Sequence, residues 1–129
     1  VFSHCYYVAS DGTPTFKNYY PADTTALGSG DIEAYIYDDP NQMFVIQADG
    51  ASAVTCVGRN ADTDGIGGST TTGVSTRELD SSTIATTQGL QLKIMGAVQD
   101  DINGDLTADN ANLVVIINEH AYRGPVAGT

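Results

Sequence analysis

The sequence predicts an all-β fold, a small β-barrel or sandwich-like single domain of short antiparallel strands with one short helical turn. Short segments with alternating or continuous apolar residues recur along the chain, and turn residues separate them. The 14 glycines and a charged content of only 16% suit strands and turns better than long helices. With 129 residues, of which 41% are hydrophobic, the chain can bury one core, so we expect one β-rich domain over residues 1–129.

The first strand is expected at residues 1–8, where both alternating faces are largely apolar. A turn at residues 10–14 follows, and then a short aromatic stretch at residues 15–20, which Pro21 ends and which is an edge strand or a hairpin partner. Because Val1 already belongs to the strand pattern and no initiator Met precedes it, we expect that the full-length protein has a further N-terminal segment.

Residues 31–48 are expected to form a β-hairpin. Apolar and polar residues alternate in its first half, and the second half is a compact apolar strand. The connection, residues 38–41, has the sequence Asp-Asp-Pro-Asn, which a type I turn prefers, and this short turn would set the register. Tyr35 and Tyr37 lie on the more polar face and are candidates for an assembly contact.

One helical turn or two are expected at residues 51–57, where apolar residues recur at intervals of three and Asp49 or Ser52 could cap the turn. Residues 75–78 fit a capping box of the form S-x-x-E. The Asp, Ser and Thr residues at 80–83 are expected to break any helix that begins there, so at most one turn results.

Two strong strands are expected at residues 90–98 and 113–123, and their apolar content predicts that they form the core. An acidic connection, residues 99–112, joins them. It contains Asn103 followed by Gly104, a dipeptide typical of hairpin turns.

The same connection imitates a calcium-binding loop. Its oxygen-bearing side chains fall at positions one, three, five and nine of such a loop, namely Asp101, Asn103, Asp105 and Asp109. A calcium loop also needs Gly at position six and a bidentate Glu at position twelve, where this chain has Leu106 and Asn112, and it needs helical flanks. We therefore expect a solvated turn without metal ligands. A calcium-dependent binding or adhesion module is the alternative function.

Residues 61–76 are rich in Asp, Gly, Ser and Thr and predict a long surface loop. Asp62 and Asp64 could gather a hard cation there, but a solvated loop explains them more simply. The glycines of this loop do not form a phosphate-binding motif, because no Lys follows them and no strand-to-helix pattern surrounds them.

No catalytic residue, metal ligand or cofactor is predicted. His4 and His120 are the two histidines, neither falls in a motif with ligand or triad spacing, and we expect each to bind a backbone carbonyl. Glu119 and His120 are adjacent on a strand and therefore point to opposite faces. We expect no enzyme, with a hydrolase or lyase of unfamiliar type as the remaining rival. Cys5 and Cys56 are expected to be buried free thiols and not a disulfide.

The chain has 16 acidic and 5 basic residues and a net charge of -11. Such a charge would repel nucleic acid and anionic membrane surfaces. No apolar stretch approaches the length of a transmembrane helix. We therefore expect neither nucleic acid nor a membrane among its partners.

Four segments of the chain carry distinctive sequences, namely residues 37–50, 67–87, 90–106 and 111–123. Their most specific pieces are the Asp-Asp-Pro-Asn turn with the strand after it, the Glu-Leu-Asp-Ser-Ser-Thr sequence, and the strand that ends in Ile-Asn-Glu-His. In this order the segments resemble structural proteins of tailed bacteriophages, especially marine ones, that decorate the capsid, and the resemblance spans nearly the whole chain, from Val1 to Arg123.

This resemblance implies a capsid decoration or cement protein, a β-barrel module that clamps neighbouring subunits on the exterior of the shell and has no catalytic residues. Its partner would be the shell formed by the major capsid protein, and the protein itself would form a homo-oligomer, a trimer in the simplest case. It would be located on the virion after assembly in the cytoplasm of the host bacterium. The chain departs from the resemblance at its start, where such proteins carry a further segment that could anchor them.

Overall fold

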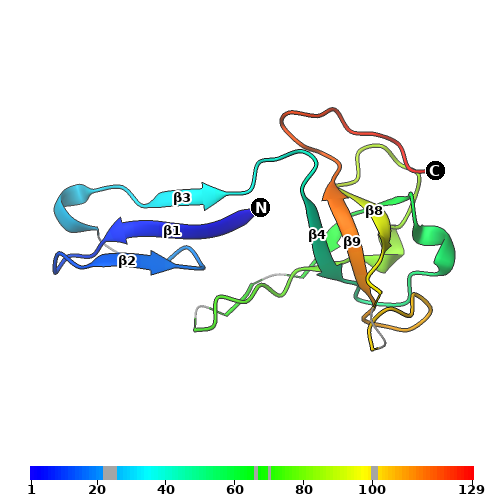
Figure 1. Cartoon of the computed structure of the whole chain (residues 1–129), viewed down its shortest axis with the longest axis horizontal. Helices are drawn as coiled ribbons and strands as arrows, with labels where there is room; N and C mark the ends of the chain where they lie inside the picture. The colour runs from blue at the N-terminus through cyan, green and yellow to red at the C-terminus, as the bar shows by residue number, and fades with distance from the viewer. Residues whose placement is uncertain (22–25, 66, 70, 100–101) are drawn as a thin grey trace. The chain divides into compact units, whose positions relative to one another are not determined.

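The computed structural model describes residues 1–21, 26–65, 67–69, 71–99 and 102–129, and it confirms an all-β fold (Figure 1). The named strands pair antiparallel in sheets that do not close into a barrel, which agrees with the sandwich-like form of the prediction. Helical structure in the described residues is limited to single 3-10 turns, η1 (Leu27–Ser29), η2 (Val54–Cys56) and η3 (Ser81–Thr83).

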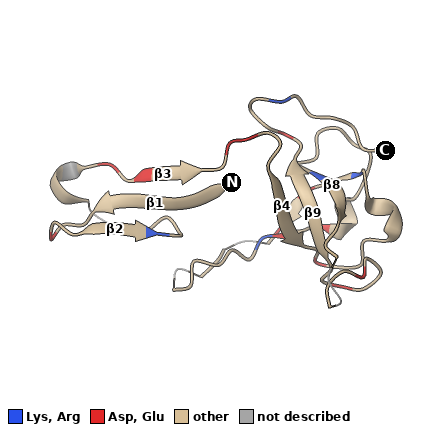
Figure 2. Cartoon of the chain, viewed as in Figure 1, with Lys and Arg blue, Asp and Glu red and all other residues tan. Residues whose placement is uncertain are grey.

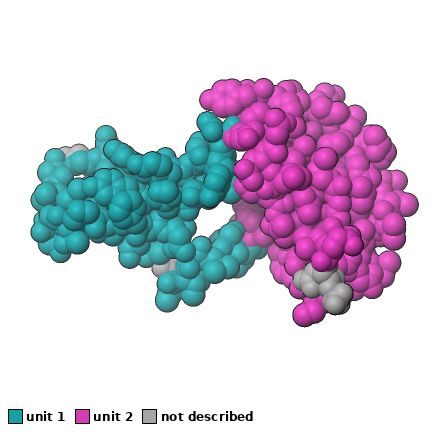
Figure 3. All heavy atoms as spheres, viewed as in Figure 1, with its two compact units in different colours: residues 1–38, 67–76 teal, residues 39–66, 77–129 magenta. Residues whose placement is uncertain are grey.

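The chain divides into two compact units (Figure 3). The first unit comprises residues 1–38 and 67–76, and the second unit comprises residues 39–66 and 77–129. A single domain over residues 1–129 stays a prediction, since this division alone does not decide whether the two units fold together.

The first unit contains a three-stranded sheet in the order β2-β1-β3. Its strands are β1 (Phe2–Val8), β2 (Pro14–Lys17) and β3 (Glu33–Ile36). β1 and β2 form a hairpin, as predicted, and the backbone N–H of Gly12 donates to the carbonyl of Ala9 at 2.8 Å in the turn. Gly12 has a φ of 86°, which glycine adopts without strain.

One face of β1 carries the small core of the first unit. Cys5 and Tyr7 point to this face and are buried together with Ala26. The Cys5 thiol donates to the carbonyl of Tyr19 at 3.3 Å. Cys56, in the second unit, is also a buried free thiol, so the prediction for both cysteines is confirmed.

The second unit contains a four-stranded sheet in the order β4-β9-β8-β5 and a two-stranded sheet formed by β6 and β7. The strands are β4 (Met43–Gln47), β5 (Asn60–Ala61), β6 (Thr63–Asp64), β7 (Glu78–Leu79), β8 (Leu92–Ala97) and β9 (Asn112–Ile117). β8 and β9 pair antiparallel at the centre of the larger sheet, as Figure 1 shows, which confirms the two strands predicted as the core. The second strand is shorter than predicted, because β9 ends at Ile117 and residues 118–123 form bends and a turn.

The inner face of this sheet carries the main core. Ile94, Leu113 and Val115 are buried there against Leu79 of β7. Burying each of these side chains stabilises the fold by about 1.5–3 kcal/mol, so this cluster is a principal source of stability. The Cys56 thiol belongs to the same core, and burial raises its pKa.

The predicted hairpin at residues 31–48 is wrong in its pairing. The turn forms, because the Asp39 carboxylate accepts from the N–H of Asn41 at 2.8 Å and the Asp39 carbonyl from that of Gln42 at 3.1 Å. However, β3 pairs with β1, and β4 pairs with β9 along its full length. All four residues of β3 are exposed, so pairing with β3 would not bury the apolar side chains of β4. Pairing with β9 lets Phe44 and Ile46 pack on the main core.

The helical predictions are confirmed only in part. η2 lies within residues 51–57, but no side chain caps it, and the Asp49 carboxylate instead accepts from the N–H of Ser81 at 2.9 Å. The residues expected to break a helix form a turn themselves, because Asp80 caps η3 by accepting from the N–H and the hydroxyl of Ser82 at 2.9 and 2.6 Å. Glu78 belongs to β7, so the capping box at residues 75–78 is wrong.

The predicted loop at residues 61–76 contains more pairing than expected. In the second unit, β6 pairs with β7. In the first unit, Gly68 bridges to Ser75, and the N–H of Ser69 donates to the carbonyl of Val74 at 2.9 Å. The glycines there allow a reversal with positive φ, which a loop prediction from composition does not reveal.

Candidate interaction surface

The acidic connection between β8 and β9 is organised as turns. Asp101 lies outside the described residues. The Asp105 carboxylate accepts from the hydroxyl and the N–H of Thr107 at 2.7 and 2.9 Å, and these bonds lower its pKa. Leu106 is buried, and its carbonyl accepts from the N–H groups of Ser52 and Ala53 at 2.9 and 3.1 Å. The position that a calcium loop reserves for Gly therefore anchors this connection to the core.

The other residues weighed against a cation site do not converge. Asn112, which stands where a calcium loop needs its bidentate Glu, is a residue of β9 and pairs with Gln47. Asp62 accepts from the N–H of Gln91 at 3.0 Å, while Asp64 is exposed on β6. Across the part of the chain that the structure describes, no group of three or more His, Cys, Asp or Glu side chains could hold a metal ion.

The two histidines do not make the predicted bonds to backbone carbonyls. His4 Nδ1 lies 3.1 Å from Ser3 Oγ, and its ring stacks on Tyr35 at 4.5 Å between centroids with an interplanar angle of 7°. His120 Nδ1 accepts from the N–H of Tyr122 at 3.1 Å. Both imidazoles bind groups close to them in the sequence, and His120 lies beyond the end of β9, outside the strand that was predicted to hold it. The neighbouring Glu119 is exposed.

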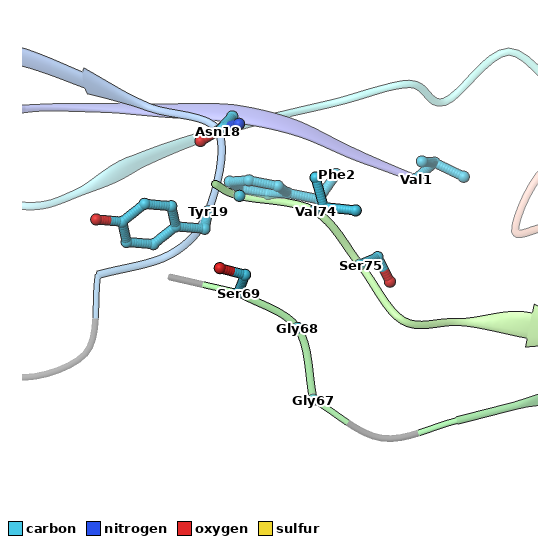
Figure 4. A pocket seen from close by; sticks show the side chains of 10 residues that line it. Val1, Phe2, Asn18, Tyr19, Gly67, Gly68, Ser69, Val74 and Ser75 are labelled. Carbon is cyan, nitrogen blue, oxygen red and sulfur yellow. The ribbon is translucent and has the colours of Figure 1, made fainter. Parts of the chain in front are cut away.

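The first unit has a pocket of about 580 Å³ (Figure 4). Phe2, Tyr19 and Val74 line it together with glycines and serines of residues 67–75. No carboxylate, imidazole or thiol is among its lining side chains. The pocket therefore offers apolar and backbone contacts and no acid–base pair.

Aromatic side chains gather on one face of the first unit's sheet, opposite the face that carries Cys5 and Tyr7. We call His4, Tyr6, Phe16 and Tyr35 the aromatic face; Tyr6 and Phe16 are cross-strand partners with ring centroids 4.9 Å apart. Phe16 is 66% exposed and Tyr35 is 46% exposed. The Tyr35 hydroxyl donates to Glu33 at 3.3 Å, and that carboxylate raises the pKa of the hydroxyl. Tyr35 and Tyr37 are both exposed, as predicted.

The second unit also exposes apolar side chains on its sheet. On the side opposite the main core, Met43 of β4 pairs with Ile116 of β9, and Val45 pairs with Val114. We call these four residues the outer apolar face; Met43 is 59% exposed and Val45 63%. β4 and β9 contain no charged residue, as their tan colour in Figure 2 shows. An antiparallel sheet that faces water on one side normally carries polar residues there.

The outer apolar face was missed at the sequence level, although a signal for it existed. Residues 43–46 and 113–117 are continuous apolar runs, and a strand with such a run has two apolar faces. The prediction placed the run at residues 113–117 in the core and gave neither run an exposed face. β4 also lies at the edge of the four-stranded sheet, so its backbone borders the same surface.

Among the described residues, no helix is long and apolar enough to cross a membrane. A scan of known protein families finds none that matches this chain. Searches of curated proteins and of solved structures find no match either.

Proposed function

We propose that this protein is a structural component of a bacteriophage particle, which decorates the outer surface of the capsid and stabilises it by binding the shell of major capsid protein. The observation that carries this proposal is that both units expose apolar side chains on their sheets, at the aromatic face and at the outer apolar face. Exposed apolar patches on soluble proteins mark surfaces that bind other proteins. The resemblance of the chain from Val1 to Arg123 to phage decoration proteins supplies the identity of the partner.

The charge of the chain supports a place on the exterior of the particle. A net charge of -11 disfavours contact with packaged nucleic acid, which is itself strongly negative. The aromatic face and the outer apolar face carry few charges, so contacts through them depend on apolar burial more than on ion pairs. Binding to the shell should therefore tolerate salt.

The size of the two faces supports repeated weak contacts. The aromatic face spans three strands of four to seven residues, and the outer apolar face spans two strands of five and six. Each covers roughly 200 Å² of sheet, well below the ~800 Å² per partner of a stable interface. A shell presents many identical sites, so linked copies gain avidity without a large single contact. A homo-oligomer, such as a trimer, would supply this linkage.

The test begins with the location of the protein. Cryo-electron microscopy of purified virions should show it on the head in a fixed ratio to the major capsid protein. The proposal is refuted if the protein occurs in the tail or is missing from virions.

A binding assay then tests the surface. Val45→Lys places a charge on the outer apolar face, where it does not disturb the core, and should weaken binding to shells that lack the protein by about tenfold or more. Thr55→Lys is the matched control, because Thr55 is exposed in η2 and outside the sheets. Equal losses in both variants would argue against the outer apolar face as the contact.

A further inference from the structure

Residues 125–129 lie in the second unit as an extended segment held through its own backbone. We call this segment the strap; Figure 1 shows it in red near the C-terminus. The side-chain amides of Asn60 and Gln88 donate to the carbonyls of Val126 and Pro125, both at 2.7 Å. The strap's other bonds join Val126 N–H to Asn118 Oδ1, Ala127 O to Lys93 Nζ, Gly128 N–H to Thr86 O and Thr129 N–H to Gly58 O.

Two buried asparagines are among the residues that bind the strap, and we call this set of residues the strap groove. Asn60 and Asn118 are both 0% exposed. Asn118 Nδ2 also donates to the carbonyls of Gln88 and Leu90, at 2.8 and 3.0 Å. Asn60 Oδ1 is buried without a hydrogen-bond partner. Because a buried amide is costly unless it is bonded, a groove that keeps two of them beside the strap is built to bind peptide backbone.

The groove selects a glycine at one position. A Cβ atom on Gly128 would lie 2.9 Å from Arg59 Cα and 3.0 Å from the carbonyl oxygen of Ala85, so no larger residue fits without moving the backbone. Val126, by contrast, is 52% exposed, and its side chain takes little part in the contact. The groove thus recognises an extended peptide by its backbone and by one glycine.

The strap joins the rest of the unit through a short exposed connection. Arg123 is anchored, because its guanidinium donates to the carbonyl of Ile117 at 2.6 Å. Gly124, which follows, is exposed, and a Cβ atom built on it would meet no atom within 4 Å. A backbone hydrogen bond of an exposed segment adds little free energy, because water offers a similar bond, and the entropy cost of ordering five residues opposes this gain. None of the strap residues belongs to the main core, so departure of the strap would leave the contacts of that core in place.

We propose that this groove is an exchangeable peptide site, and that in assemblies it binds the strap of a second copy of this chain. An identical segment makes identical contacts, so exchange between copies loses no bond, and neighbouring copies supply a high local concentration of straps. Exchange would link copies in a chain or ring. This inference requires an assembly of copies but not a capsid, so it stands apart from the proposed function.

Hydrogen exchange on the intact wild-type chain is the first test. The N–H groups of Val126, Gly128 and Thr129 should exchange at least about tenfold faster than those of Leu113 and Val115 in the core. The proposal is overturned if the strap amides exchange only as fast as the core amides, because the strap would then leave only on global unfolding.

A labelled peptide of residues 124–129 is the second test. The full-length Gly128→Ala variant, whose own strap no longer fits, should bind the peptide at least about tenfold more tightly than the wild-type chain does. A peptide with Ala in place of the residue equivalent to Gly128 is the control and should not bind. Equal binding of the two peptides would overturn the assignment of the groove. If the variant does not fold, the hydrogen-exchange result decides.

The third test asks whether a strap crosses between copies. Native mass spectrometry of wild type mixed with Gly128→Ala should show mixed oligomers, in which the variant's groove takes a wild-type strap. Mixed oligomers should disappear when the labelled peptide is added in excess. Oligomers that persist at full yield under excess peptide would refute exchange between copies. A failure of the protein to bind capsids would leave all three results unchanged.

Discussion

Replacing Asn118 by alanine should destabilise the second unit more than any other polar substitution in the strap groove. Asn118 is 0% exposed and follows directly after β9. Its side chain makes three hydrogen bonds, donating to the carbonyls of Gln88 and Leu90 and accepting from the N–H of Val126 at 2.9 Å. These bonds connect the end of β9 both to residues 88–90 and to the strap, so alanine removes a link between three segments.

The magnitude follows from the number of bonds. A net contribution of about 0.5–1.5 kcal/mol per hydrogen bond gives a loss of about 3 kcal/mol for three bonds. For a chain of this size, that loss lowers Tm by about 10 °C. Gln88→Ala is the matched control. Gln88 is exposed on the surface of the unit, and its side-chain amide donates one hydrogen bond of 2.7 Å to the carbonyl of Pro125. It should cost no more than about 1 kcal/mol.

Urea unfolding followed by far-ultraviolet circular dichroism measures both variants. The midpoint should fall clearly for Asn118→Ala at an unchanged m value, since the substitution changes stability and not the surface exposed on unfolding. A loss below about 0.5 kcal/mol would refute the reasoning, because it would mean that water replaces all three bonds at no cost. If Gln88→Ala lowers the free energy of unfolding as much as Asn118→Ala does, burial of the side-chain amide does not determine the cost of losing its hydrogen bonds.

Three further outcomes are expected. Ala53 has a φ of 59° and a ψ of 154°, a backbone conformation that strains any residue with a Cβ. Ala53→Gly should therefore raise the free energy of unfolding by about 1 kcal/mol in urea titrations, and a decrease would contradict the presence of strain. Hydrogen bonds from Ser81 lower the pKa of Asp49 below its ordinary 3.8. The ionised carboxylate therefore stabilises the fold above pH 3.8, and this stability is lost as the pH falls through the lowered pKa. Asp49→Asn should show a shallower loss of stability in acid, and identical acid curves for variant and wild type would refute this. Because Asp105 is engaged in its own turn, millimolar calcium or EDTA should leave Tm unchanged within about 1 °C, whereas a large shift would favour the calcium-dependent alternative.

The sequence predicted strands more reliably than their partners. The apolar runs in β8 and β9 specify both the strands and their burial, and their connection in sequence makes their pairing local. The turn at Asp39 is equally well specified, yet it does not decide which strand β4 joins. That choice depends on the burial of Phe44 and Ile46 against β9, a segment more than sixty residues away. A local sequence pattern does not indicate which distant strand gives the most favourable pairing.

The sites differ in how far a sequence can reveal them. The outer apolar face has a signal, since Val114 and Val115 are neighbours that point to opposite sides and both are apolar. The strap groove has none, because Asn60 and Asn118 resemble the many turn asparagines of the chain. Their burial arises only when three distant segments meet around them.

Net charge and apolar surface act at different distances, and together they favour assembly on a partner over aggregation. A charge of -11 makes free copies repel one another, but at physiological salt this repulsion decays over about 8 Å. Contacts within that distance are governed by the apolar side chains of Met43 and Val45 and by the aromatic face, where the Tyr35 hydroxyl binds the neighbouring carboxylate of Glu33. If a shell holds copies side by side, as we propose, the repulsion is already overcome, and the faces and straps of neighbouring copies can bind. Raising the salt concentration should therefore promote self-association of the free protein, and a decrease in its mass by sedimentation at high salt would contradict this account.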